Sequence, residues 1–94
     1  MGAWVITLPA PGTILWRVLV HLHHVGIPST RSAIARQTQL RPSQVGAALQ
    51  RLDKIGAVMV VDELCTTKEH AWALTTGARH SVGLQMRRLD VQNR

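Results

Sequence analysis

The sequence lacks phenylalanine and tyrosine, so its three tryptophans must supply all of the aromatic bulk. It has one cysteine, Cys65, which excludes an internal disulfide and favours a reducing compartment. No stretch approaches the roughly 18 apolar residues of a membrane-spanning helix, so no membrane partner is expected. The first residues lack the basic region of a signal peptide, and their apolar run ends at Leu8, before Pro9 and Pro11. We therefore expect a cytoplasmic protein.

Acidic residues are also scarce. Five Asp and Glu stand against eleven Lys and Arg, giving a net charge of +6, and nine of those eleven cations are arginines. No two acids have a spacing that suggests acid–base catalysis, and there is no glycine loop for phosphates. His80 and Ser81 are adjacent in sequence, but no third group to orient them is evident. We expect no enzyme, no catalytic residue and no cofactor, and a polyanionic partner.

The hydrophobic fraction of 46% and the 94 residues predict one globular domain over 1–94. The segment 1–11 is predicted to be an N-terminal arm. Its β-prone part, Trp4–Leu8, is either a strand or an extension over the core or over a second subunit.

Apolar residues at helical spacing predict a first helix over 12–25. Its buried face is assigned to Ile14, Leu15, Val18, Leu19 and Leu22. Trp16 and Val20 form a second apolar strip, which we interpret as a dimer contact.

Two further helices follow, over 30–38 and 42–55, separated by a tight turn. Ser29 or Thr30 is the expected cap of the earlier helix, and Ile27–Ser29 is a candidate edge strand. In the later helix, Pro42 suits the first position and Gly56 the position after the end. The residues expected on its buried face are Val45, Ala48, Leu49, Leu52 and Ile55. Two short helices joined in this way are typical of a helix-turn-helix.

After Gly56 the periodicity becomes strand-like, which predicts a β-hairpin over 57–74 with strands at 57–62 and 68–74. A last helix is predicted over 75–90, capped by Thr75 or Thr76, with the end of the chain fraying. Its apolar side carries Ala78, Val82, Met86 and Leu89. That side either packs on the first helix or dimerises. The expected fold class is mainly α with a small β-hairpin (α+β), a winged helix-turn-helix in the order helix, short strand, helix, helix, strand, strand, helix.

The outer face of the helix over 42–55 carries residue types that read base edges or bind phosphates. Gln44 and Gln50 are candidates for reading adenine, while Arg36, Arg41 and Arg51 are candidates for holding phosphates. The predicted DNA-binding residues are Arg31, Arg36, Arg41, Ser43, Gln44, Ala47, Gln50, Arg51, Lys54 and Lys68. Asp53 is the one acid within the helix-turn-helix.

The chain resembles the MarR-type winged-helix regulators over roughly 14–82. The matching residues are Ser32-Ala33-Ile34-Ala35, Leu40, Val45, Leu49, Leu52, Lys54-Ile55-Gly56-Ala57-Val58 and Trp72-Ala73-Leu74-Thr75-Thr76-Gly77-Ala78-Arg79. The resemblance implies a homodimer on a palindromic operator, with the later helix of the pair in the major groove and the wing on the backbone or in the minor groove. It implies no enzyme chemistry.

The sequence departs from the family at several positions. Gly46 and Ala47 stand where a Ser-Arg-like pair is common. Arg41 occupies the usual cap position of the reading helix, with Ser43 as the candidate substitute. The wing is short and carries the acids Asp62 and Glu63.

Three histidines and the cysteine are candidates for a metal or redox site. His21 and His24 are three residues apart and compatible with metal binding, but no Cys, Asp or Glu lies near them in sequence. We interpret them, with His23, as solvated residues and expect no metal. Cys65 has no second cysteine to resolve an oxidised sulfur, so it is interpreted as an ordinary residue.

The sequence therefore predicts a sequence-specific double-stranded DNA-binding protein, a small repressor that acts as a homodimer by occupying its operator. It would be associated with the nucleoid, or lie in a host's cytoplasm if phage-encoded. The alternative is a winged helix used as a protein-interaction module, for example a phage or plasmid inhibitor or adaptor of a nucleoprotein complex. The small Gly46-Ala47 pair at the centre of the reading helix and the acidic wing both favour this alternative. A third option, single-strand or RNA binding, would require exposed tryptophans for stacking.

Overall fold

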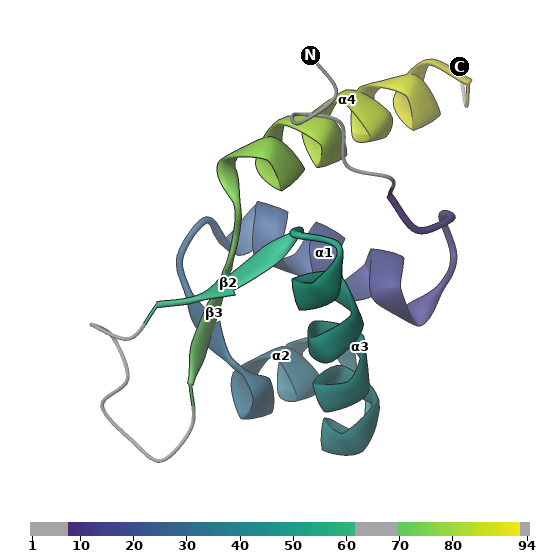
Figure 1. Cartoon of the computed structure of the whole chain (residues 1–94). Coiled ribbons are helices and arrows are strands. Elements are labelled where there is room, and N and C mark those ends of the chain that lie inside the picture. The colour runs from purple at the N-terminus through teal and green to yellow at the C-terminus, as the bar shows by residue number, and fades with distance from the viewer. Residues whose placement is uncertain (1–7, 62–69, 93–94) are drawn as a thin grey trace.

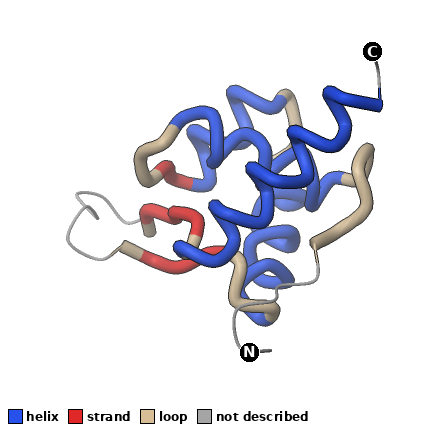
Figure 2. Tube along the Cα trace, turned by 90° about the horizontal axis from the view of Figure 1, so that it is seen from above, coloured by secondary structure: helices blue, strands red, loops and turns tan. Residues whose placement is uncertain are grey.

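The computed structural model describes residues 8–61 and 70–92, and the N-terminal helix α1 (Ile14–Val25) lies at its centre. It contacts α2 (Arg31–Thr38), α3 (Pro42–Lys54), α4 (Thr76–Gln92) and strand β3 (Ala71–Leu74). The small strands gather at one end of the molecule, and α4 lies across the other side of α1 from α2 and α3 (Figures 1 and 2). The winged helix-turn-helix fold predicted from the sequence is confirmed.

The core is built from apolar side chains that α1 and α3 direct toward each other. Leu19 and Leu22 of α1 and Leu49 and Leu52 of α3 are essentially inaccessible to solvent. Burying a leucine of this kind contributes about 1.5–3 kcal/mol. The inner face of α3 is thereby held against α1, and its outer face is directed away from the core.

The helix-turn-helix is closed by backbone geometry at the end of α2. Gln39 adopts a left-handed conformation (φ 60°), and the N–H of Leu40 donates to the carbonyl of Ala35 at 3.1 Å. The guanidinium of Arg17 on α1 donates to the carbonyl of Thr38 at 2.6 Å. The turn is thus bonded both to α2 and to α1. These bonds fix the direction in which α3 follows α2.

The sheet has three strands in the order β1-β3-β2, all antiparallel. β2 (Val58–Val60) pairs with β3 so that Val58 lies opposite Leu74. The predicted edge strand is displaced: β1 is Ser29–Thr30 rather than Ile27–Ser29, and Thr30 also caps α2 by accepting from the N–H of Ala33 at 3.2 Å. The arm residues 1–7 and the hairpin tip 62–69 lie outside the described residues.

Two predicted apolar assignments in the helices are wrong. Trp16 is buried, 7% exposed, and Val20 packs against the core, because α1 is surrounded by other elements and has no free second strip. Ile14 and Ile55 are instead 37% and 45% exposed. Ile55 is the C-cap that follows Lys54, the last residue of α3. The helical spacing that buries the apolar face no longer applies there.

The C-terminal helix packs on α1 through the apolar side named from the sequence. Ala78 and Val82 are fully buried, and Met86 and Leu89 are partly buried against the core. Packing on α1 is therefore observed for this side. The helix continues to Gln92, beyond the predicted end and into the segment expected to fray; residues 93–94 lie outside the described residues. None of the described helices is long and apolar enough to cross a membrane.

Thr75 joins the end of α3 to the start of α4. Its hydroxyl donates to the carbonyl of Gly56 at 2.7 Å and accepts from the N–H of Ala78 at 3.3 Å. Its backbone N–H donates to the carbonyl of Ala57 at 3.0 Å. One side chain thus caps α4 and fixes the chain that leaves α3.

We predict that Thr75→Val lowers the free energy of unfolding by about 1–2 kcal/mol, because the isosteric side chain loses both hydroxyl hydrogen bonds. Thr75→Ser keeps the hydroxyl and serves as the control, with a smaller loss from the missing methyl group. Urea denaturation followed by circular dichroism measures both. Equal stabilities for the Val and Ser variants would contradict this role.

Candidate nucleic-acid interface

The outer face of α3 is the candidate interface, and its start is held by an unusual cap. Arg41 occupies the N-cap position and offers no side-chain acceptor, and Pro42 begins the helix. The side-chain oxygen of Gln44 accepts from the backbone N–H of Arg41 at 3.0 Å. Gln44, rather than the expected Ser43, therefore makes the side-chain contact at the helix start, but it satisfies the N–H of the N-cap residue itself, which is one half of a capping box.

This contact changes the role predicted for Gln44. Reading adenine in bidentate fashion needs the amide oxygen to accept from the base and the amide nitrogen to donate to it. In the structure that oxygen is directed back to the helix start. Gln50, one turn and a half further along α3, is exposed and free of this constraint.

All nine predicted DNA-binding residues that lie in the described part of the chain are exposed. Six of them, Ser43, Gln44, Ala47, Gln50, Arg51 and Lys54, recur at helical spacing on the side of α3 opposite its buried stripe. Arg31 and Arg36 project from α2, and Arg41 precedes α3. The remaining residue, Lys68, lies outside the described residues. The six residues on α3 thus form one exposed face of amides, cations and small side chains, and Arg31 lies beside Gly46 of the same helix.

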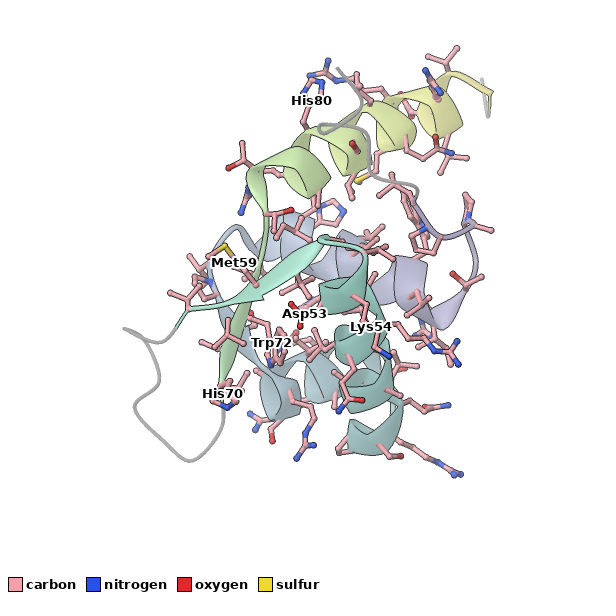
Figure 3. The ribbon with its side chains drawn as sticks, viewed as in Figure 1. Asp53, Lys54, Met59, His70, Trp72 and His80 are labelled. Atoms are coloured by element: carbon pink, nitrogen blue, oxygen red, sulfur yellow. The ribbon has the colours of Figure 1, made fainter. Side chains whose placement is uncertain are left out.

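The acid of the helix-turn-helix points away from that surface. Asp53 and Lys54 leave α3 on opposite sides, with Asp53 directed toward the hairpin and Trp72 (Figure 3). Both side chains are exposed. The outer face of α3 therefore carries Arg51 and Lys54, while Asp53 lies on the hairpin side of the helix.

An apolar hollow adjoins this face where α1 begins. Ile14, Leu15, Ala47 and Ala48 line it, together with Gln44 and Arg51. The sequence pattern assigned Ile14 to the core and did not predict that it would lie beside the outer face of α3. Arg17, which anchors the turn, was also missed, because only the folded chain shows that its guanidinium reaches the end of α2.

Of the histidines of α1, His23 lies beside α4, where a Cβ built at Gly83 would meet its Cε1 at 3.7 Å. Burial of His21 lowers its pKa, and the positive charge of His24 lowers this pKa further. His23 is half-buried, its Nδ1 is buried without a partner in the structure, and its ring meets that of His24 edge-on at 6.1 Å between centroids. In the ranges 8–61 and 70–92, no three His, Cys, Asp or Glu residues are grouped to hold a metal ion. Cys65 lies outside these ranges.

No protein-family model and no curated protein matches the chain. Solved structures do match it. The ZitR protein of Lactococcus lactis, in a C30AH42A mutant without ligand, is 18% identical with a TM-score of 0.74 over 86% of this chain and 60% of that one. A probable transcriptional regulator from Pseudomonas aeruginosa is 20% identical with a TM-score of 0.76, over 92% of this chain and 62% of that one.

A crystal structure of "a putative dna-binding protein" from Ralstonia eutropha is 23% identical with a TM-score of 0.66 over 77% of this chain and 93% of that one. This chain spans about three fifths of the length of the ZitR protein and of the Pseudomonas aeruginosa regulator. The resemblance to MarR-type regulators predicted from the sequence is confirmed at the level of the fold.

We predict that Gln44→Ala lowers the free energy of unfolding by about 0.5–1 kcal/mol, because the Arg41 N–H loses its partner. Gln44→Glu keeps an acceptor, and its charge suits a helix N-terminus, so stability is retained at neutral pH. Thermal melts of the two variants provide the measurement. An alanine variant as stable as the original chain would show that this oxygen does not cap α3.

Proposed function

We propose that this protein binds double-stranded DNA in a sequence-specific manner and regulates transcription, with α3 in the major groove. The fold it shares with transcriptional regulators supports a regulator rather than an enzyme. The observation that carries the proposal is the outer face of α3, where exposed amide and cationic side chains recur along a helix of suitable length. An α-helix of this kind fits the major groove of B-form DNA.

Within this proposal the side chains divide by chemistry. Gln50 reads adenine through its amide, and Ala47 provides an apolar contact for a thymine methyl group. Arg36, Arg41 and Lys54 hold phosphates and thereby set the register of α3 on the duplex. Arg51, near the end of α3, also contacts phosphate.

We further propose that the protein acts as a homodimeric repressor that occupies its operator. Two copies would place their α3 helices in major grooves about one helical turn apart, roughly 34 Å. The outer side of α4 supports self-association, because Leu84 and Val91 are 42% and 69% exposed there. Occupancy of a promoter by such a dimer would exclude other proteins. We place it in the cytoplasm, at the nucleoid.

The alternative of a protein-interaction module is not favoured, because the structural neighbours are regulators. Its sequence argument depended on the small Gly46-Ala47 pair at the centre of α3 and on the acidic wing, whose Asp62 and Glu63 lie outside the described residues.

We predict that Arg51→Met weakens duplex binding and lowers the slope of log affinity against log salt by about 0.9, the value of one phosphate contact. Fluorescence anisotropy with a labelled mixed-sequence duplex over a salt series measures both. Arg79→Met, at an exposed position in the first turns of α4, removes the same charge away from α3 and from Leu84 and Val91, and is the matched control. Gln50→Ala should weaken the free energy of binding by about 1–3 kcal/mol on duplexes selected by the original chain, and should leave binding to other duplexes unchanged.

Equal effects of Arg51→Met and Arg79→Met would contradict the proposed face, since binding would then depend on net charge alone. An unchanged preference of Gln50→Ala for the selected duplexes would remove Gln50 as a base reader.

A further inference from the structure

Gly46 lies in the middle of α3, where glycine is the least favourable residue after proline. Its backbone does not require glycine, because the glycines with positive φ are Gly12, Gly26 and Gly56. The reason is instead spatial. A Cβ built at position 46 would lie 3.3 Å from Cδ of Arg31 and 3.5 Å from its Nη1. The missing side chain of Gly46 therefore leaves the space that the Arg31 side chain uses.

Arg31 belongs to a different helix. It is the first residue of α2, directly after the capping residue Thr30, and its side chain crosses to α3. A cation at a helix N-terminus is opposed by the helix dipole. Within residues 8–61 and 70–92 the guanidinium forms no hydrogen bond or ion pair with an acid that would offset this. A position of this kind suits an anion as its partner.

The space beside Gly46 that the Arg31 side chain occupies, here called the seat, lies at the edge of the outer face of α3. Ser43 and Gln50, one turn before and one turn after Gly46, are both exposed. In a helix-turn-helix the earlier helix lies across the DNA backbone while the later one enters the groove. A side chain that starts on α2 and ends beside α3 therefore reaches the rim of the groove, where the phosphates lie.

We propose that Gly46 seats Arg31 so that its guanidinium contacts a DNA phosphate beside the reading helix. The inference rests on the proposed function. Packing of the Arg31 stem over α3 restricts a side chain that otherwise has many rotamers, so less conformational freedom is lost on binding. Position 46, which lacks the polar side chain common in related regulators, thus gains a cation from the neighbouring helix.

The test is a double-mutant cycle between positions 31 and 46, read by binding to a labelled mixed-sequence duplex at several salt concentrations. Arg31→Met keeps the apolar stem and removes the charge, so affinity should fall roughly 3- to 10-fold and the salt slope by about 0.9. Gly46→Leu fills the seat and should cause a similar loss, with a smaller one for Gly46→Ala. In the Arg31→Met background neither substitution should weaken binding further.

Gly83→Ala is the matched control, because it replaces a mid-helix glycine of α4 where the new Cβ would meet Cε1 of His23 at an ordinary 3.7 Å. It should leave duplex binding unchanged. Thermal melts verify that each variant is folded. If Gly46→Leu misfolds, Gly46→Ala alone completes the cycle.

An equal loss from the position-46 substitutions in both backgrounds would overturn the inference, since the new side chain would then obstruct the duplex directly. If the original chain binds the duplex and substitutions at positions 31 and 46 leave its affinity unchanged, the inference is overturned as well, while the proposed function remains in place. Failure of the original chain to bind any duplex at low salt would overturn both.

Discussion

The packing of α3 against α1 is the constraint on which the rest of this structure depends. Leu49 and Leu52 of α3 meet Leu19 and Leu22 of α1 in a core with no buried polar or charged side chain among the described residues. Because the apolar stripe of α3 covers only one side of the helix, its burial decides which residues remain outside. The turn bonds at Leu40 and Thr38 and the Thr75 hydroxyl then hold the two ends of α3 in place. The exposed face is therefore a rigid surface.

Periodicity was sufficient to predict most of the fold, because burial acts on patterns that can be read along the chain. The helices, the hairpin and the inward faces of α3 and α4 follow from it. The prediction failed where neighbours in space decide. Trp16 is buried because α1 is enclosed by other elements, and Ile55 is exposed because the helix ends before it. Neither fact is visible in the spacing of apolar residues on one helix.

The candidate site was predictable in composition but not in geometry. Residue types alone pointed to the outer face of α3, and its predicted members are exposed. The roles of individual side chains depend on contacts that cross the fold. Gln44 caps its own helix, and Arg31 lies over a glycine on another helix. Gly46, a departure from the MarR-type pattern that the sequence resembles, takes on a physical role only when α2 is placed beside α3.

The central claim is that a duplex docks on the outer face of α3. The most direct measurement is a titration of the isotopically labelled protein with a mixed-sequence duplex, followed by amide chemical shifts. The account predicts changes concentrated at Ser43, Ala47, Gln50 and Arg51, with the outer side of α4 near Leu84 unaffected. Changes centred on α4, or none along α3, would contradict it.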